Sequence, residues 1–390
     1  MSGMAESWNV INSKLLPRIL DALGHPFDSC RDYMATLLFR MCYAHRKLVA
    51  AEAISPKEMD WANPAVQIVE KILSVLHVGG TPSRQDYRAM VTARKFMSYS
   101  LHLGDVKYEQ GRHLIKLLPG AFLALKATEQ EKGGDEKMTK DDVALRALQA
   151  DVVKTFRLTL SEVASSLVIS YKGSNNILLL LKSIETASEN ELWQIRHAAT
   201  HVMRCVQGNH KFLFHESESQ LATKTIINLL PDSRREVSSA ALAALTGILA
   251  VTPSKQVASL VDKYVVIANK TVIKKKKKNS KAVSTTSTSE TNKSDEERSR
   301  KQQTAVFFLC STVLSQPYET PNYIPKALAA LSKHSFERTA PLVVRDAVKK
   351  CCSEYKRTHM SDNWEVHKRQ FTEEQLDALD DVVSTPHYYA

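Results

Sequence analysis

The stretch LATKTIINLLPDSRREVSSAALAALTGILA, residues 221–250, is typical of one repeat of an α-solenoid. Residues 221–230 predict a first helix, Pro231 and Asp232 predict a turn, and residues 234–250 predict a second helix. Apolar side chains recur on one face of the second helix at the three-and-four spacing, and they are Val237, Ala241, Leu242, Leu245, Ile248 and Leu249. Small residues let neighbouring helices approach closely, namely Ala240, Ala241, Ala243 and Ala244. This stretch therefore predicts a HEAT-like helix pair.

Comparable helical patterns run along the whole 390-residue chain, and no alternating strand pattern of useful length interrupts them. The helices come in pairs roughly 35–50 residues apart, which is the period of HEAT and armadillo arrays. We predict an all-α, HEAT/armadillo-like solenoid of antiparallel helix pairs, with an ordinary helical bundle as the alternative. The predicted helices span residues 8–23, 28–50, 65–77, 83–103, 108–118, 141–169, 175–187, 191–206, 218–230, 234–250, 255–269, 303–314, 323–333, 342–357 and 372–383.

Residues 271–300 differ in composition from the rest of the chain. They contain five consecutive lysines, Lys274, Lys275, Lys276, Lys277 and Lys278, and a tract rich in serine and threonine. Such a segment cannot bury enough apolar surface to fold, so we predict a disordered insertion. The chain then divides into HEAT-like repeats at 1–270, the insertion at 271–300, further helical repeats at 301–385 and a tail at 386–390.

The lysine run has two interpretations: a nuclear localisation signal, or a solvated loop, which costs little between helices. We expect the protein in the nucleus and the cytoplasm. Residues 270–301 carry +7 of the formal net charge of +11, so little positive charge remains for the folded part. A basic stripe on a folded face, typical of nucleic-acid binding, is therefore not expected.

Cysteine and histidine patterns do not indicate a catalytic or zinc protein. The cysteines show no CxxC spacing, so reduced, mostly buried thiols in an intracellular protein are expected. His197 and His201 have the i,i+4 spacing of metal ligands, and Cys205 follows one turn later. However, Ala198 stands where the HExxH motif has glutamate, so a polar helix face is the favoured interpretation. No P-loop, membrane span or signal peptide is evident, and no cofactor is expected.

The end of the chain carries the most specific pattern. Four stretches precede the final Tyr388, Tyr389 and Ala390, and they are EYKRTH at 354–359, DNW at 362–364, HK at 367–368 and FTEEQL at 371–376. Together they closely resemble the C-terminal signature of the giant monomeric HEAT-repeat proteasome activators, the proteasome activator complex subunit 4 family. Within this pattern, Asp362 or Asn363 is the predicted N-cap of the next helix, and Trp364 a predicted core anchor.

The resemblance is specific over about residues 340–390 and looser from about Trp193. Before about Lys172 it consists of helical-repeat character and the short stretches HPFD at 25–28 and RD at 31–32. Members of this family are several times longer. The resemblance therefore identifies the chain as the C-terminal part of such an activator.

The resemblance implies a non-catalytic activator that caps one end of the proteasome core particle. Its terminal Tyr-Tyr-Ala inserts between two α-ring subunits, and the gate opens for substrates without ubiquitin or ATP. Tyr388 would take the hydrophobic position and Tyr389 the hydrogen-bonding position. The carboxylate of Ala390 would pair with a lysine of the pocket, because charge-assisted contacts are stronger than neutral hydrogen bonds.

Two further partners follow from the resemblance: acetylated histones and inositol polyphosphates. Acetyl-lysine recognition in the family uses an Asn-Phe pair, but Thr252 and Pro253 stand at that place in this chain. The alternatives from other classes are an importin-like transport or scaffold adaptor, and nucleic-acid binding through residues 274–278. The latter would be independent of sequence and sensitive to salt.

Overall fold

The structure is a computed structural model that describes residues 2–51, 63–76, 82–100, 117–124, 140–166, 174–272, 288–337 and 340–383. These residues form helices and their connections, with no strand among them. The chain divides into two compact units, Met1–Ala222 and Thr223–Ala390. Within the described ranges, no helix is both long enough and apolar enough to cross a membrane.

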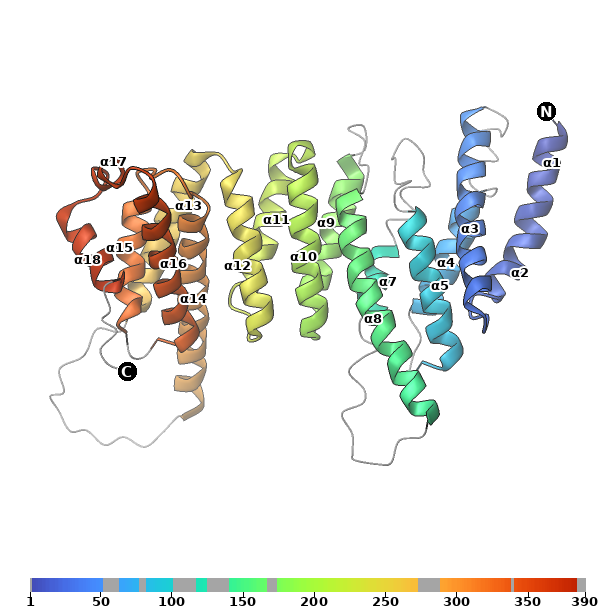
Figure 1. Ribbon diagram of the computed structural model, residues 1–390, viewed down its shortest axis with the longest axis horizontal. Helices are drawn as coiled ribbons and strands as arrows, with labels where there is room; N and C mark the ends of the chain where they lie inside the picture. The colour runs from blue at the N-terminus through green and yellow to red at the C-terminus, as the bar shows by residue number, and fades with distance from the viewer. Residues whose placement is uncertain are drawn as a thin grey trace. The chain divides into compact units, whose positions relative to one another are not determined.

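The helices of the first unit are shown in Figure 1. They are α1 Ser2–Val10, the π-helical turn η1 Ile11–Leu15, α2 Leu16–Asp21, α3 Asp28–Ala50, α4 Pro64–Leu76, α5 Arg84–Ser100, α7 Leu117–Ala124, α8 Lys140–Ser166, α9 Ser174–Ser188, α10 Trp193–His210 and the 3-10 turn η4 Lys211–Leu213. Helix α11, Glu216–Leu229, contains the boundary between the units.

The helices of the second unit follow the sequence pattern in the same way. They are α12 Arg235–Ala250, α13 Ser254–Thr271, α14 Thr288–Leu314, α15 Ile324–Ser335, α16 Leu342–Ser361, the short α17 Trp364–Lys368 and α18 Glu373–Val383. The predicted helix at residues 108–118 lies mostly outside the described residues.

In the first unit the helices stack in two rows. One row contains α3, α5, α8 and α10, each packed on the next, and the other contains α4, α7 and α9. Cross-contacts such as α4 with α5 and α9 with α10 join the rows. This arrangement arises because each amphipathic helix buries its apolar stripe only against the helices before and after it. The predicted solenoid of helix pairs is confirmed.

The second unit continues the same two-row plan within itself. Helix α14 packs between α12 and α16, and α13, α15 and α18 follow one another on the other side. Residues 305–313 of α14 are all buried, from Ala305 to Val313. A helix that is apolar around its whole circumference belongs in the centre of a core. The ring of Phe308 stacks on that of Tyr264 in α13, with centroids 4.1 Å apart.

The disordered insertion that we predicted at residues 271–300 extends too far toward the C-terminus. Residues 288–300 belong to α14, and the residues that remain outside the description are 273–287. Ion pairs one turn apart support the exposed part of this helix: Lys301 to Glu297 at 2.6 Å and Arg298 to Asp295 at 3.3 Å. Opposite charges at these spacings stabilise helices. The mixed charge that we interpreted as disorder is therefore the solvent face of a helix.

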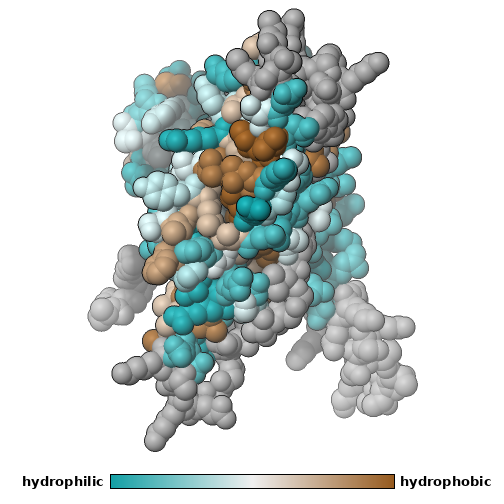
Figure 2. All heavy atoms as spheres, turned by 90° about the vertical axis from the view of Figure 1, so that its right-hand side faces the viewer, coloured by the Kyte–Doolittle hydropathy of each residue, from teal (hydrophilic) through white to brown (hydrophobic). Residues whose placement is uncertain are grey.

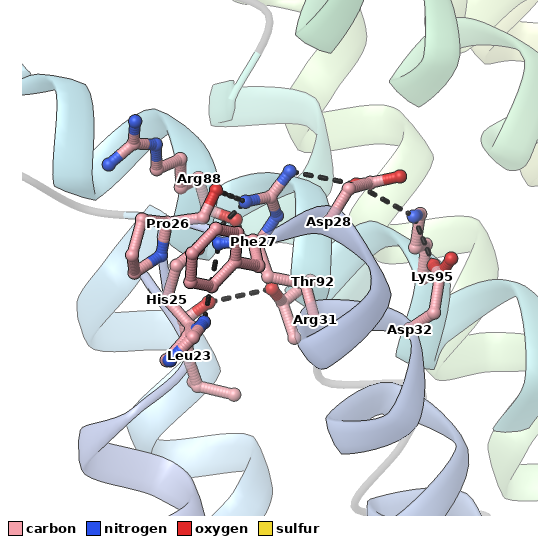
Figure 3. Close-up of polar contacts among 10 residues, drawn as sticks. All are labelled: Leu23, His25, Pro26, Phe27, Asp28, Arg31, Asp32, Arg88, Thr92 and Lys95. Atoms are coloured by element: carbon pink, nitrogen blue, oxygen red, sulfur yellow. Dashed lines mark hydrogen bonds and ion pairs between the residues drawn. The ribbon is translucent and has the colours of Figure 1, made fainter.

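A buried arginine holds the turn that precedes α3 (Figure 3). Arg31, the fourth residue of α3, donates from Nη1 to the carbonyl oxygens of His25 at 2.7 Å and Pro26 at 3.0 Å. Its Nη2 pairs with the Asp28 carboxylate at 2.7 Å. Carbonyl groups just before a helix have no helical partner, so the guanidinium satisfies them where water has little access.

The same arginine geometry recurs before α10. Arg196 is also the fourth residue of its helix, and its Nη1 donates to the carbonyl oxygens of Asn190 at 2.9 Å and Glu191 at 2.7 Å. In both helices these carbonyls lie six and five residues before the arginine. We call this arrangement the arginine clamp. It is a repeat signature of the fold rather than a feature of one site.

At Asp28 the clamp connects with ion pairs that link α3 to α5. Lys95 of α5 pairs with Asp28 at 3.2 Å and with Asp32. Burial by itself would raise the pKa of the Asp28 carboxyl, but Lys95 and Arg31 together hold this pKa below its ordinary value. The Thr92 hydroxyl of α5 donates to the carbonyl oxygen of Leu23 at 2.7 Å. The stretches at 25–28 and 31–32 therefore have a structural role.

The outer face of the first helices carries an apolar patch. Figure 2 shows apolar side chains gathered on this end of the first unit, with hydrophilic ones around them. Exposed apolar residues of these helices are Val10, Leu15, Tyr33, Leu37 and Tyr43. In contrast, Trp8 and Cys42 are buried, and the burial of Cys42 agrees with the prediction of mostly buried thiols.

The cysteines largely follow the expectation of buried thiols. Cys42, Cys310, Cys351 and Cys352 are buried, whereas Cys30 and Cys205 are half-buried. Burial raises the pKa of the Cys42 thiol to about 12, which makes it a poor nucleophile. Of the tryptophans, Trp8 is a core anchor, Trp193 and Trp364 are half-buried, and Trp61 lies outside the described residues.

Replacing Arg196 with alanine should lower the free energy of unfolding by about 2 kcal/mol, because two carbonyl groups lose their charged donor. Urea denaturation followed by circular dichroism measures this change. Arg204→Ala, at an exposed position of the same helix, is the matched control and should change stability by less than about 0.5 kcal/mol. Equal effects of the two substitutions would contradict the clamp.

Candidate functional site

The predicted tail residues Tyr388, Tyr389 and Ala390 lie outside the described residues, and so do Lys274, Lys275, Lys276, Lys277 and Lys278. The roles assigned to them from the sequence therefore stay predictions. The last described helix is α18, which ends at Val383. The site that the structure describes is the base from which the final residues 384–390 leave the folded unit.

The start of α18 is defined by a capping box. The backbone N–H of Gln375 donates to the Thr372 hydroxyl at 3.3 Å, and the backbone N–H of Thr372 donates to the Gln375 side chain at 3.0 Å. This reciprocal pair satisfies two N–H groups at the helix start. The negative charges of Glu373 and Glu374 in the first turn interact favourably with the positive end of the helix dipole.

Helix α18 is held against the body of the second unit. It packs on α15 and α16, and it buries Leu379 and Val382, each with only 2% of its surface exposed. Asp380 accepts a hydrogen bond from Lys356 of α16 at 2.5 Å. The chain therefore leaves α18 from a packed position, so the origin of the tail is defined.

A threonine hydroxyl connects three parts of the chain beneath α17. Thr320, in the α14–α15 connection, hydrogen-bonds through Oγ1 with the Tyr355 hydroxyl of α16 at 2.7 Å and with His367 Nδ1 of α17 at 2.9 Å. Burial raises the pKa of Tyr355 to about 12, although the bond to Thr320 acts in the opposite direction. Tyr355 is therefore a neutral phenol that can donate or accept.

The second ring nitrogen of His367 points to an acidic partner. Its Nε2 lies 3.1 Å from Asp362 Oδ2, and the imidazole itself is buried. The prediction that Asp362 or Asn363 is the N-cap of this helix is confirmed for Asn363, which occupies the position without a side-chain hydrogen bond. Asp362 pairs with His367. The carboxylate thus stabilises the imidazole ring rather than the helix end.

His359 completes the connection between α16 and the Thr320 segment. Its Nε2 lies 3.2 Å from the carbonyl oxygen of Glu319, and its Nδ1 lies 2.9 Å from that of Tyr355 and 3.0 Å from the Thr358 hydroxyl. A carbonyl oxygen only accepts, so a ring nitrogen that carries a proton donates to the carbonyl oxygen that it faces, Glu319 at Nε2 or Tyr355 at Nδ1.

Ring contacts pack this region as well as its hydrogen bonds. The imidazole of His359 stacks on Tyr355 with centroids 3.9 Å apart, and it meets the edge of His367 at 4.6 Å. The ring of Phe371, just before α18, lies 6.3 Å from both Tyr355 and Trp364. Trp364 is only half-buried, so it packs the edge of this cluster and is not a core anchor.

Sequence reasoning identified most of this region but missed its centre. Tyr355, His359, Trp364, His367 and Phe371 all belong to the stretches that carried the resemblance. Thr320 did not stand out, because a threonine before a proline in a connection is ordinary. Only packing reveals that its hydroxyl is shared between two helices that lie 35 and 47 residues further along the chain.

The chemistry of this region is that of polar packing. The imidazoles are engaged with carbonyls, a carboxylate and hydroxyls. Across the part of the chain that the structure describes, no three residues among His, Cys, Asp and Glu gather as a metal ion would require. The arrangement can position a helix and the tail that follows it.

The residues at the place of the acetyl-lysine pair form an ordinary helix connection. Thr252 donates from its hydroxyl to the carbonyl oxygen of Ile248 at 2.7 Å, and Pro253 is the N-cap residue of α13. The Thr252 hydroxyl therefore satisfies a carbonyl oxygen in the last turn of α12. It does not supply the amide that an asparagine would offer.

Comparison with known proteins agrees with this picture of the C-terminal region. Residues 299–390 match the family model described as "Proteasome activator complex subunit 4-like, C-terminal". The chain resembles the C-terminal part of proteasome activator complex subunit 4. The match starts in α14, includes the Thr320 cluster and α18, and runs to Ala390. The resemblance predicted from the sequence is confirmed.

Individual relatives extend the similarity. "Proteasome activator subunit 4" of Arabidopsis thaliana is 30% identical over 207 residues, which cover 53% of this chain and 10% of the relative. "Proteasome activator complex subunit 4" of Homo sapiens is 44% identical over 85 residues, which cover 22% of this chain and 4% of the relative. The matched part of this chain thus spans about a tenth or less of the length of these relatives.

Among solved structures, Kap121p bound to Pho4p aligns with 96% of this chain and 36% of its own, at a TM-score of 0.39 and 14% identity. A likeness of this size supports no argument about function. The sequence similarity to proteasome activator complex subunit 4 is what bears on the role of the C-terminal region.

Replacing Thr320 with valine should lower the free energy of unfolding by about 1–3 kcal/mol, because the buried Tyr355 and His367 lose a shared partner. Thr320→Ser keeps the hydroxyl and should lose clearly less. Thermal and urea unfolding of both variants measures the difference. If valine and serine destabilise the protein equally, the hydroxyl is not the centre of the network.

Proposed function

We propose that this chain is a proteasome activator, or its C-terminal part, that binds the end of the proteasome core particle through Tyr388, Tyr389 and Ala390. The observation that carries the proposal is the family match, which continues without a break from α14 to the final residue. The relatives to which this chain is similar are named for proteasome activation. The described geometry adds a packed helix immediately before the tail.

A fixed origin makes the proposed tail effective. Seven residues, 384–390, follow α18, and a chain of this length can reach at most about 25 Å. The Leu379 and Val382 contacts and the Lys356–Asp380 pair hold the helix from which they start. Anchoring one end of a short segment confines the other end to a small volume. This confinement raises the local concentration of the tail at a pocket beside the docked unit.

The chemistry of the last three residues suits capture at a pocket between two α-ring subunits. The carboxylate of Ala390 would form a charge-assisted contact with a lysine, and recognition of a terminal carboxylate is a recurrent mode of peptide binding. Tyr388 would fill an apolar slot and Tyr389 would use its hydroxyl as a hydrogen-bonding group. Tyrosine provides this contact area at a low cost in conformational entropy.

In the proposed mechanism the helical units dock on the core particle and the inserted tail displaces gate residues. Peptides and unfolded proteins then enter without ubiquitin or ATP. The activator contributes binding and no bond-making chemistry, in line with a family that regulates a peptidase. The His359, His367 and Thr320 cluster would serve this mechanism by keeping α17 and α18 in one orientation.

Acetylated histones and inositol polyphosphates stay predictions from the resemblance and form no part of this proposal. No described residue supplies the expected asparagine amide at the acetyl-lysine position, where Thr252 bonds within its own helix end. A histone-peptide pull-down with acetylated and unmodified tails would test the first partner directly.

Residence in the nucleus and cytoplasm is proposed from the lysine run alone. Replacing Lys274, Lys275, Lys276, Lys277 and Lys278 with alanine should lower the nuclear fraction of a fluorescent fusion. Binding to the core particle should not change, because the positions lie between helices α13 and α14 and far in the sequence from the tail. An unchanged distribution would exclude the run as a localisation signal.

Deletion of Ala390 should weaken binding to the purified core particle by at least about tenfold, because the carboxylate and both rings move out of register. Tyr389→Ala should have nearly the same effect, and Tyr388→Asp should also prevent binding because its charge must be desolvated. Tyr388→Phe keeps the apolar area and is the matched control that should bind normally. Co-sedimentation and hydrolysis of a fluorogenic peptide measure binding and gate opening.

Binding that survives all of these changes would exclude the tail as the anchor and favour a transport or scaffold adaptor. A full loss with Tyr388→Phe would instead show that the first tyrosine is recognised through its hydroxyl. Normal binding without peptide hydrolysis would show that this chain docks on the core particle but does not open the gate. This outcome matters because the matched part of the chain corresponds to only 10% of the Arabidopsis relative.

A further inference from the structure

Two histidines on helix α10 converge through the same ring atom. His197 and His201 lie one turn apart in an 18-residue helix, Trp193–His210. Their Nε2 atoms are 3.3 Å apart, and the ring centroids are 4.6 Å apart with the planes at 70°. His201 is exposed and His197 half-exposed, so an ion in solution can reach this edge of the helix.

The distance between the two Nε2 atoms agrees with the distance between two ligands of one metal ion. Zinc binds histidine nitrogen at about 2.0–2.1 Å in tetrahedral sites, which places two such ligands about 3.3 Å apart. A square-planar or octahedral ion with cis ligands at the same bond length would need about 2.9 Å. The observed Nε2–Nε2 distance therefore matches the ligand spacing of tetrahedral coordination.

Packing holds this pair in place. Helix α10 packs on α8 and α9, and the residues between and beside the histidines, Ala198, Ala199 and Val202, are buried. The ring of Trp193, one turn earlier, meets His197 edge-on with centroids 6.3 Å apart. Ligands on a packed helix keep their geometry better than ligands on a loop, so little ordering is needed when an ion binds.

We propose that His197 and His201 bind one Zn²⁺ ion, with water completing the coordination. Imidazole suits zinc, and two histidines at this spacing form the helical half of many zinc sites even where, as here, Ala198 replaces the catalytic glutamate. Among the described residues no third His, Cys, Asp or Glu joins the pair, and the proposal assigns His197 and His201 as the protein ligands. The proposal departs from the interpretation of the pair as a polar helix face that the sequence favoured.

The alternative explanation of the short distance is a hydrogen bond between neutral rings, in which one Nε2–H donates to the other Nε2. Zinc binds the unprotonated Nε2 of each ring, so the donating ring moves its proton to Nδ1, and binding weakens as the pH falls and both rings gain protons. The two explanations describe the metal-free and metal-bound forms of the same pair. Only a measurement of zinc binding tests the second.

The experiment uses the untagged full chain and Zn²⁺ alone, titrated by calorimetry at pH 7.5. One zinc per chain should bind, and zinc should raise the melting temperature. His197→Asn and His201→Asn should each weaken binding by at least about tenfold. His201→Cys should retain zinc because a thiolate is also a ligand, which separates ligation from any structural role of the ring. His215→Asn, a change at an exposed histidine outside the pair, is the matched control and should bind normally.

Absence of zinc binding to the wild-type chain would overturn the proposal, and so would normal binding by both asparagine variants. A loss of binding in Cys205→Ser would overturn the assignment of two protein ligands, because that thiol lies one further turn along α10. Normal zinc binding by Cys205→Ser supports it. Circular dichroism of each variant confirms that the helical fold is kept.

Discussion

The second unit depends on the complete burial of nine consecutive residues, 305–313, in helix α14. A segment that is apolar on every side must have neighbours on every side, and α12, α13, α15 and α16 supply them. Its polar groups are satisfied without water: Ser311 donates to the carbonyl oxygen of Leu242 at 3.1 Å, and Thr312 donates to that of Phe308 at 3.0 Å. The C-terminal helices are therefore built on one central helix.

Two kinds of contact hold the helices between α14 and the tail. Apolar burial holds α15, α16 and α18 together, whereas the direction of the short α17 is determined by hydrogen bonds around Thr320. Such a polar cluster specifies one arrangement, because each buried donor or acceptor would lose a partner in any other. Residues 299–390, which match the activator family model, therefore include the contacts that position α17 and α18 before the tail.

The first unit uses a different device at its turns. Arg31 and Arg196 occupy the same position in their helices and bind the same two carbonyls of the preceding turn. A planar guanidinium can satisfy two carbonyls at once, which an ammonium does less well. The residue pattern shows arginine four residues into a helix, but its partners are backbone atoms and leave no mark in the sequence. The clamp therefore becomes visible only when two turns are compared in three dimensions.

Apolar periodicity was sufficient to predict most of the helices, their pairing and the core positions of α12 except Leu242, because burial of one helical face is a local property of residue order. The stretches at 354–376 were sufficient to predict the resemblance to proteasome activator complex subunit 4. Charge composition misled the prediction at residues 288–300, since ion pairs one turn apart can stabilise a helix that has no apolar face. The bonds of Thr320, the pairing of Asp362 with His367, and the 3.3 Å approach of His197 to His201 were decided by tertiary structure. Each depends on distance and ring orientation, which packing determines and residue order does not.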